Sequence, residues 1–318
     1  MCIMNAELIE NIWLRKDAKA GKKQKNIKTG LVVQGGGMRG IYSMAALMAF
    51  EELGLGKAFD HILGSSAGAI NGAYFLAGQA KLAVTVYLDD ISNRNFINFL
   101  RFRKIADIDF LVDVVLQKKK HLDVDKVISS SSTLHIILTD FKTGEAAVFT
   151  NKDRDIDIME LIRATASMPV LYNRVHYVNG RGYIDGGISD AIPLLKAIEL
   201  GCTDIVVVLT RSLTFRRKRP GIFLRVMEFP FMRKYPDNVK NTLLLEDQHF
   251  NCTMDYLENP AGLGKDVRVL VIYPSNMHDM VSRTTKSRSD LLNCALMGRN
   301  DARNALMLDP LDDNPFGC

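Results

Sequence analysis

Short apolar segments alternate along most of the chain with longer segments that have a helical pattern of apolar residues. The short segments predict β-strands at residues 31–34, 59–63, 134–140, 146–149, 182–184, 205–210 and 267–273. The longer segments predict helices at residues 38–53, 69–80, 158–167 and 194–200. Strands that alternate with helices in this order favour an α/β protein built around a β-sheet.

The regions outside this alternation of strands and helices predict that the chain is divided into three parts. Residues 8–14 fit a short amphipathic helix that we expect to lie outside the catalytic core, and a lysine-rich linker follows it. Residues 81–130 are predicted to be mainly helical with a basic and aromatic interruption at 93–104, and the last forty residues are again mostly helical. We therefore expect a basic arm over 1–28, a main domain over 29–275 and a helical extension over 276–318.

The segment 61–80 has the length of a membrane span, because it contains twenty residues without a charge. Its four glycines and its polar residues instead indicate a buried strand, a turn and a helix of a soluble fold. Residues 1–30 lack the basic-then-apolar order of a secretory signal. We therefore predict no membrane span, no export and a cytoplasmic location.

Composition adds that the chain is folded and does not depend on disulfides or metal. Hydrophobic residues make up 47% and charged residues 24% of the 318 positions, which is average for globular proteins and excludes disordered classes. The five cysteines are scattered and form no C-x-x-C pair, so neither a disulfide framework nor a zinc site is indicated. We predict no metal and no cofactor.

The first candidate motif is a glycine-rich loop between the predicted strand 31–34 and the following helix. It consists of Gly35, Gly36, Gly37, Met38, Arg39 and Gly40. Glycines at such a turn let backbone N–H groups approach an anion closely, and the start of the helix adds positive potential. The glycine spacing also satisfies a dinucleotide motif, but Asp60, the acidic residue at the required distance, begins a strand instead of ending one. We therefore do not expect dinucleotide binding.

The second motif, a G-x-S-x-G sequence, lies at the next strand-to-helix turn. It consists of Gly64, Ser65, Ser66, Ala67 and Gly68. Small neighbours at this position permit the tight turn of a nucleophile elbow, which exposes the hydroxyl of the central serine. Ser66 is therefore the candidate nucleophile, and Ser65 is disfavoured because it occupies the second position of the motif.

The third motif, Asp185-Gly186-Gly187, follows the predicted strand 182–184. A carboxylate at a strand end with glycines after it can reach a neighbouring loop, which suits a general base or an orienting group. Taken alone, this tripeptide is an ordinary turn. Its significance depends on the two motifs that precede it.

The three motifs, each at a strand end and in this order, resemble those of the patatin-like phospholipase family. The sequence at residues 163–170 and 183–194 also resembles the family around its aspartate, and the likeness extends over about 28–273. The resemblance implies a three-layer α/β/α sandwich with a mostly parallel central sheet, related to the α/β hydrolases. It also implies hydrolysis of phospholipids or other fatty acyl esters without a metal or a cofactor.

The resemblance also assigns roles to residues of this chain. Ser66 would attack the acyl carbonyl and Asp185 would take its proton, a dyad in place of the usual triad. The oxyanion hole would be formed by N–H groups of the loop residues Gly35, Gly36, Gly37 and Met38. The remaining motif residues would support these groups; they are Arg39, Gly40, Gly64, Gly68, Gly186 and Gly187.

Several alternatives stay open at this stage. An acyltransferase would use the same acyl-serine with an alcohol as acceptor, and a non-catalytic lipid-binding module would need neither motif residue. A histidine could also complete a triad: His61 and His135 fit the core, whereas His176 and His249 remain candidates. We prefer the dyad because the family order of serine and aspartate requires no histidine.

The net charge of +5 is concentrated in two segments, 1–30 and 211–240, which together are far more basic than the rest of the chain. In the second segment the cluster Arg216, Arg217, Lys218 and Arg219 leads into residues 223–234, which mix cations with large apolar side chains. We interpret this as a lid that docks on anionic lipid at the inner membrane face. A packed helix with a solvated basic edge is the alternative. We expect no nucleic-acid binding because no recognised module accompanies the charge.

Overall fold

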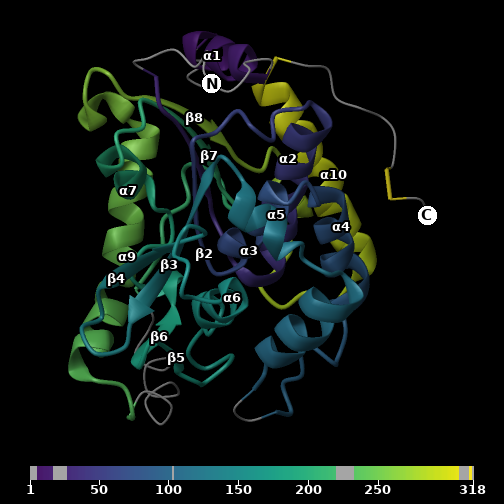
Figure 1. The fold of residues 1–318 in the computed structure, drawn as a ribbon, viewed down its shortest axis with the longest axis vertical. Helices are drawn as coiled ribbons and strands as arrows, with labels where there is room; N and C mark the ends of the chain where they lie inside the picture. The colour runs from purple at the N-terminus through teal and green to yellow at the C-terminus, as the bar shows by residue number, and fades with distance from the viewer. Residues whose placement is uncertain (1–5, 17–26, 102–103, 220–232, 308–314, 317–318) are drawn as a thin grey trace.

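A central β-sheet of eight strands organises the protein, and helices cover both of its faces (Figure 1). The computed structural model describes residues 6–16, 27–101, 104–219, 233–307 and 315–316. The strands are β1 Thr29–Val33, β2 His61–Ser65, β3 Thr133–Asp140, β4 Ala146–Thr150, β5 His176–Val178, β6 Arg181–Asp185, β7 Asp204–Val208 and β8 Arg268–Ile272.

Nine α-helices lie among the described residues, together with shorter helical turns. The α-helices are α1 Ala6–Lys16, α2 Gly40–Glu52, α3 Ala67–Leu76, α4 Ala80–Thr85, α5 Val124–Ser129, α6 Ile158–Thr165, α7 Leu194–Glu199, α9 Asp237–Glu258 and α10 Arg288–Ala305. The 3₁₀ turns are η1 Gly37–Arg39, η4 Gly186–Ile188, η5 Pro260–Leu263 and η6 Met277–Asp279, and the π-helical segments are η2 Val86–Asp90 and η3 Phe110–Lys119. No helix in the described ranges is both long and apolar enough to cross a bilayer.

Five parallel strands form the body of the sheet, in the order β3-β2-β1-β7-β8. Strands β4 and β6 pair antiparallel with opposite sides of β3, and β5 pairs antiparallel with β6. The sheet is therefore mostly parallel, with antiparallel strands around β3. Together with the helices on both faces, this confirms the predicted α/β/α sandwich.

The strand residues alternate between two hydrophobic clusters, one on each face of the sheet. In β1, Leu31 and Val33 belong to the larger cluster with α2 and α3, whereas Val32 belongs to the smaller cluster with α7 and α9. Because both faces are covered, the strands are apolar on both sides and appear in the sequence as uninterrupted apolar segments. This burial explains why the sequence shows each of these strands as a short apolar segment.

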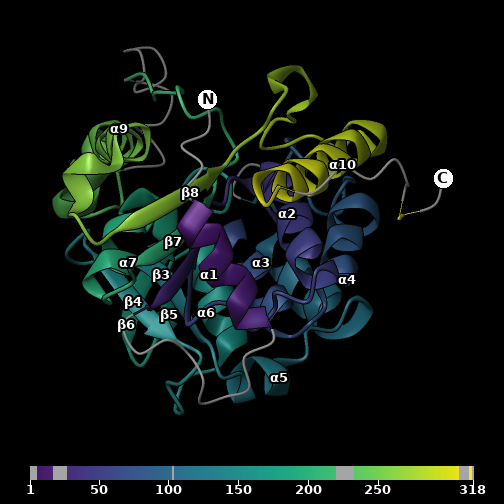
Figure 2. The ribbon, with the colours of Figure 1, turned by 90° about the horizontal axis from the view of Figure 1, so that it is seen from above.

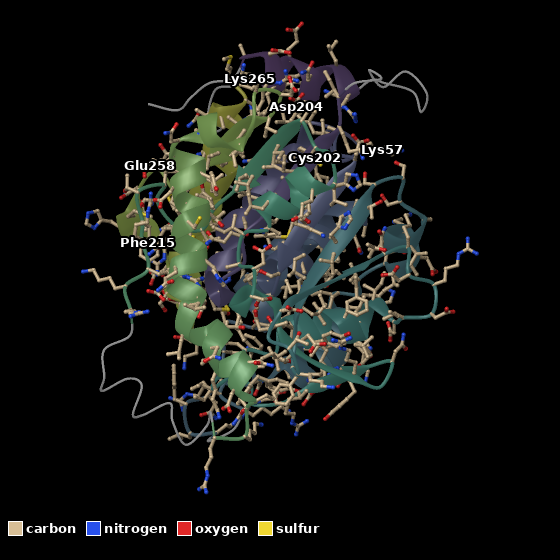
Figure 3. All side chains as sticks on the ribbon, turned by 90° about the vertical axis from the view of Figure 1, so that its left-hand side faces the viewer. Lys57, Cys202, Asp204, Phe215, Glu258 and Lys265 are labelled. Carbon is tan, nitrogen blue, oxygen red and sulfur yellow. The ribbon has the colours of Figure 1, made fainter. Side chains whose placement is uncertain are left out.

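Helix α1 packs across the amino ends of the strands, as Figure 2 shows from above. Leu8 and Ile12 are buried in the larger hydrophobic cluster, and the Asn11 amide donates a hydrogen bond of 2.8 Å to Asp204 at the start of β7. Figure 3 labels Asp204 beneath α1. The expectation that this helix lies outside the catalytic core is therefore wrong: its amphipathic face has the sheet end as its partner.

Helix α10 shares the same core, packed along α2 (Figure 2). A Cβ on Gly298 would lie 2.4 Å from the carbonyl oxygen of Tyr42, so glycine permits this close approach. The Tyr42 hydroxyl then donates a hydrogen bond of 2.8 Å to Asp301 of α10. Within the predicted helical extension over 276–318, α10 therefore shares the hydrophobic core of the sheet and α2.

Candidate active site

Ser66 lies at a strained turn between β2 and α3. Its backbone has φ 54° and ψ −132°, a conformation that residues with a Cβ rarely adopt. The flanking glycines allow the turn, because a Cβ on Gly64 would lie 2.5 Å from the carbonyl carbon of Gly68, and one on Gly68 would lie 2.1 Å from the carbonyl oxygen of Val33. The G-x-S-x-G spacing therefore has a steric cause, and the turn has the geometry of a nucleophile elbow.

The register of β3 explains why Asp185 comes next to Ser66. Strand β2 ends with Ser65 paired to Ile137, and β6 ends with Asp185 paired to the following residue, Leu138. Both strands lie on the side of β3 that faces away from β4, so the end of β6 meets the end of β2. Residues 119 positions apart in the sequence are thereby brought together, and the Ser66 hydroxyl donates a hydrogen bond of 2.8 Å to Asp185 Oδ2.

Asp185 is a buried carboxyl group with two hydrogen-bond donors. Its side chain is fully buried, and Oδ1 accepts a bond of 2.7 Å from the N–H of Gly187. Burial raises the pKa of Asp185 to about 7, although the hydrogen bonds from Ser66 and Gly187 act in the opposite direction. A carboxyl group with this pKa can exchange a proton with a neighbouring hydroxyl near neutral pH.

Gly186 and Thr165 hold the two side chains in place. A Cβ on Gly186 would lie 1.9 Å from the carbonyl oxygen of Ile137, so only glycine fits beneath β3 there. The hydroxyl of Thr165 accepts a 2.9 Å bond from the N–H of Ser66 and donates one of 2.6 Å to the carbonyl of Ile137. Sequence reasoning did not single out Thr165, and its position in the stretch 163–170 that resembles the family was the available signal.

The glycine loop lies against the same turn. Gly36 and Gly37 have φ 134° and 60°, which favour glycine, and a Cβ on Gly35 would lie 2.7 Å from the carbonyl oxygen of Ser65. Among the described residues, the N–H groups of Gly36 and Gly37 donate to no acceptor, whereas the N–H of Met38 donates to the carbonyl of Arg283 at 3.1 Å. Of the N–H groups predicted to form the oxyanion hole, that of Met38 therefore already donates to another part of the chain.

A cavity of about 110 Å³ opens beside Ser66 and Asp185. The glycine loop and several polar and charged side chains contribute to its lining, and most of the rest is lined by apolar side chains from α3, α4, η2, η3, the segments between them and the segment after α6. These side chains include Ile70, Ala83, Val86, Ile91, Phe96, Ile97, Ala106, Ile108, Leu111, Met168 and Leu171. Ser66 and Asp185 therefore lie beside the glycine loop in a mainly apolar cavity, which suits the binding of a fatty acyl ester.

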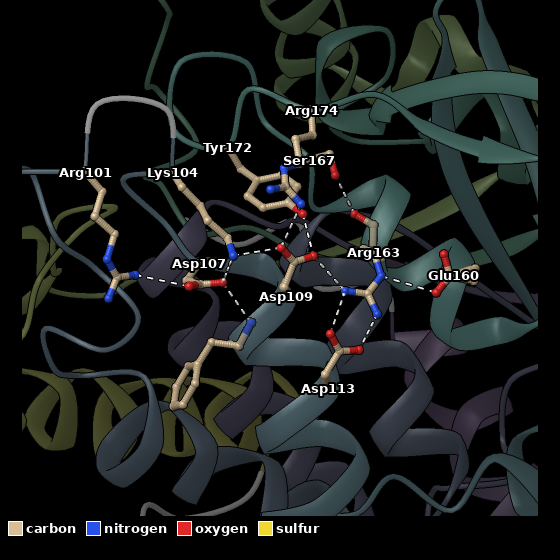
Figure 4. Close-up of polar contacts among 11 residues, drawn as sticks. Arg101, Lys104, Asp107, Asp109, Asp113, Glu160, Arg163, Ser167, Tyr172 and Arg174 are labelled. Atoms are coloured by element: carbon tan, nitrogen blue, oxygen red, sulfur yellow. Dashed lines mark hydrogen bonds and ion pairs between the residues drawn. The ribbon is translucent and has the colours of Figure 1, made fainter.

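An ion-pair network braces one wall of this cavity (Figure 4). Asp109 pairs with Lys104 at 2.8 Å and with Arg163 of α6 at 2.9 Å, and it accepts a bond of 2.6 Å from the hydroxyl of Tyr172. Tyr172 itself lines the cavity. These contacts connect the segment before η3 to α6. The pattern of apolar and polar residues in the sequence did not predict them.

None of the six histidines, all of which are among the described residues, lines the cavity. His61 Nδ1 lies 2.9 Å from His135 Nε2 on the sheet, and burial lowers the pKa of His135 to about 4. His176 stacks on Tyr172, and His249 lines a separate small pocket beside α9. The arrangement around Ser66 is thus a serine with a carboxylate.

The basic cluster of the sequence analysis is largely paired with acids of α9. Arg216 forms ion pairs with Asp255 and with Glu258, which Figure 3 labels near the end of this helix, and Arg217 pairs with Glu246. Lys218 and Arg219 are exposed, and residues 220–232 lie outside the described residues. Arg219 also forms a long ion pair of 4.0 Å with Asp247 of α9. The structure thus engages three of the four cations, and the lipid-docking role of the cluster stays a prediction.

Asp60 has a structural role at the opposite edge of the sheet. It accepts a 2.9 Å bond from the N–H of Thr29 and pairs with Arg15 of α1 at 2.7 Å. The glycine loop lies at the carboxyl ends of the strands, whereas Asp60 lies at the amino ends. The glycine loop and the acidic residue that a dinucleotide site needs close together are therefore separated by the length of the strands.

The turn at Ser66, the buried aspartate and the glycine loop lie together at strand ends of a mostly parallel sheet, as the resemblance to patatin-like phospholipases implies. The family model described as patatin-like phospholipase matches residues 31–198, which is more than half of the chain, and the protein belongs to this family. A curated relative is "Uncharacterized protein YjjU" of Escherichia coli (strain K12), which is 27% identical over 279 residues, covering 86% of this chain and 76% of the relative. Among solved structures, the crystal structure of VipD from Legionella pneumophila matches with a TM-score of 0.44 and 13% identity, over 91% of this chain and 69% of that one.

Proposed function

We propose that this protein is a serine acyl hydrolase that cleaves fatty acyl esters, of the phospholipase A, lysophospholipase or esterase type, through an acyl-Ser66 intermediate. The observation that carries the proposal is the hydrogen bond of 2.8 Å between the Ser66 hydroxyl and Asp185 Oδ2 at the polar end of an apolar cavity. Membership of the patatin-like phospholipase family supports lipid acyl hydrolysis in general. The roles of individual residues are inferred from their geometry.

In the first half-reaction, the Ser66 hydroxyl transfers its proton to Asp185 while its oxygen attacks the acyl carbonyl carbon. The carbonyl oxygen becomes an oxyanion, for which the free N–H groups of Gly36 and Gly37 are the proposed donors. Collapse of the tetrahedral intermediate breaks the ester bond, and the proton on Asp185 passes to the leaving alcohol. The acyl chain then remains on Ser66 and lies in the apolar cavity.

In the second half-reaction, a water molecule gives a proton to Asp185 and attacks the acyl-Ser66 carbonyl. The second tetrahedral intermediate releases the fatty acid, and the proton on Asp185 returns to Ser66. Both half-reactions need Asp185 to accept and return one proton, and its pKa of about 7 suits both steps near neutral pH.

Steady-state release of fatty acid from acyl esters tests this proposal. The unmodified protein should release fatty acid, and Ser66→Ala should abolish release while the circular dichroism spectrum stays native. Ser65→Ala is the matched control, because Ser65 is a buried neighbour outside the proposed dyad. Persistent release by Ser66→Ala, or equal loss in Ser65→Ala, would contradict the proposal.

Addition of a competing alcohol separates hydrolysis from acyl transfer. Both reactions share acyl-Ser66 and differ only in the acceptor that removes the acyl group. With excess glycerol, a hydrolase should still yield mainly free fatty acid. A product consisting mainly of the new glycerol ester would instead assign the protein as an acyltransferase and would leave the acyl-serine step unchanged.

A further inference from the structure

Four arginines gather around the polar end of the cavity. Arg39 belongs to η1, Arg211 follows β7, Arg217 precedes the segment that leads to α9, and Arg283 lies between η6 and α10. Arg39, Arg217 and Arg283 line the cavity together with Ser66. Arg211 lies near enough for its charge to act on Arg39. We call these four residues the arginine cluster.

The carboxylates around the arginine cluster do not balance its charge. Arg217 pairs with Glu246 and its guanidinium lies 4.1 Å from the centre of the Phe250 ring. Within the described ranges, no ion pair joins a carboxylate to Arg39, Arg211 or Arg283. In the described part of the chain, three positive charges near the proposed catalytic serine are therefore without a carboxylate partner, although Arg211 lies 4.9 Å from the centre of the Phe215 ring.

Arg39 is the member whose burial makes this imbalance costly. Its side chain is only 5% exposed, and its buried Nε has no hydrogen-bond partner in the described part of the chain. A Cβ on Gly36 would lie 3.0 Å from this Nε, so the guanidinium lies directly against the glycine loop. The buried Nε of Arg211 also lacks a partner.

A guanidinium group stays protonated at neutral pH. Burying it without a partner costs free energy, and an anion bound next to it would offset that cost. Burial and, to a smaller extent, repulsion by Arg283, Arg211 and Arg217 together lower the pKa of Arg39 to about 8. Each of these effects would be reversed by an anion placed among the four side chains. Phosphate suits this position, because guanidinium groups bind its oxygens with pairs of parallel hydrogen bonds.

Resting on the proposed hydrolase function, we propose that the arginine cluster binds a phosphate carried by the substrate, so that the preferred substrates are fatty acyl esters of glycerol with an exposed, terminal phosphate. The acyl chain fills the apolar cavity and the ester carbonyl lies at the glycine loop. The rest of the substrate then leaves through the polar end, where the arginines are. A terminal phosphate offers more charge and more free oxygens than a phosphate capped by choline.

The test compares three esters with the same octanoyl chain, used below the concentration at which they aggregate: octanoyl glycerol phosphate, octanoyl glycerophosphocholine and octanoyl glycerol. We expect kcat/KM to be at least about tenfold higher for the terminal phosphate than for the neutral ester. Arg283→Gln and Arg211→Gln should each lower this ratio by about fivefold or more. The ratio of the two kcat/KM values is measured on one variant. A change in the reactivity of Asp185 caused by the loss of Arg283 would affect both esters equally and therefore cancels.

Lys286→Gln is the matched control. Lys286 is exposed, lies in the same segment as Arg283, and does not line the cavity. The same loss of one charge there should leave the ratio unchanged. An equal effect of Lys286→Gln and Arg283→Gln would assign the preference to general surface charge and would overturn the proposal.

A ratio near one in the unmodified protein, with the neutral ester still hydrolysed, would overturn the substrate assignment and leave the proposed hydrolase function intact. Inorganic phosphate separates the two sources of the anion. If it inhibits the neutral and the phosphorylated ester alike while the ratio is near one, the cluster binds free anion, which also overturns the assignment. Inhibition that competes only with the phosphorylated ester supports it.

Binding to Ser66→Ala provides a readout without turnover. By calorimetry, octyl phosphate should bind at least about tenfold more tightly than octanol, and Arg283→Gln in the same background should remove most of the difference. If no ester is hydrolysed but this difference is present, the hydrolase proposal fails and the arginine cluster remains a phosphate site. If octyl phosphate and octanol bind equally, the phosphate site is refuted whatever the activity.

Discussion

Replacing Asp185 with asparagine should make the protein more stable and less active at the same time. The carboxyl group is fully buried, and its pKa is raised from the ordinary 3.8 to about 7. Asparagine has nearly the same shape and can still accept the N–H of Gly187, but it carries no charge. It removes the cost of ionising a buried group and also removes the proposed base.

The size of the stability change follows from the pKa difference. A shift of about three units corresponds to about 4 kcal/mol, at about 1.36 kcal/mol per unit. Because the folded-state pKa is raised, the folded protein binds more protons than the unfolded chain between the two pKa values, so stability is lost as pH rises through that window. The advantage of Asp185→Asn should therefore be greatest above pH 7, at up to about 4 kcal/mol, and should shrink by about 3 kcal/mol at pH 4.5.

Urea unfolding of both proteins at pH 8 and pH 4.5 measures this difference, and fatty acid release measures the activity. We expect Asp185→Asn to lower kcat/KM by about 10²- to 10⁴-fold, the usual contribution of a general base. Asp190→Asn is the control, because burial also raises the pKa of Asp190 to about 7 but its side chain lies in the neighbouring pocket. The reasoning is refuted if Asp185→Asn is no more stable at pH 8, if its advantage is independent of pH, or if Asp190→Asn loses as much activity.

Four further predictions concern the same site. The kcat/KM for a neutral ester should rise with pH through about 7 and then level off, because only ionised Asp185 takes a proton, and a flat profile from pH 6 to 8 would disagree. Gly37→Ala, at φ 60°, should lower kcat about 10²-fold by displacing an oxyanion donor, which activity within threefold of normal would exclude. Ala106→Phe should shorten the preferred acyl chain in a series of nitrophenyl esters, since Ala106 lines the cavity, and an unchanged preference would place the chain elsewhere. His176→Ala and His249→Ala should keep most activity in the same assay, and complete loss in either folded variant would indicate a triad.

The sheet could be predicted from the sequence because its strands are buried on both faces. All seven predicted strands are present with ends within two residues of the prediction. The missing strand, β5, has only three residues and joins β6 through Asn179 and Gly180, both with positive φ. This pair is a typical hairpin turn and was the available signal for the strand.

Ser66, Asp185 and the glycine loop could be placed at strand ends from the motifs, since each motif follows a predicted strand. The pairing of Ser66 with Asp185 depends on the register of β3, which no local pattern encodes. The same holds for Arg283, whose carbonyl engages Met38 across more than 240 positions of sequence. Contacts between distant segments are set by packing, and for that reason the sequence did not indicate that α1 and α10 pack into the hydrophobic core.

The most direct test of the central claim is the mass of the intact protein after exposure to a fluorophosphonate, which reacts with activated serines without any knowledge of the natural lipid. We predict a single adduct on the unmodified protein and none on folded Ser66→Ala. We also predict much slower labelling of Asp185→Asn, because Ser66 has then lost the group that takes its proton. An adduct that persists in Ser66→Ala would contradict the assignment of the nucleophile, and equal labelling rates with and without Asp185 would contradict the dyad.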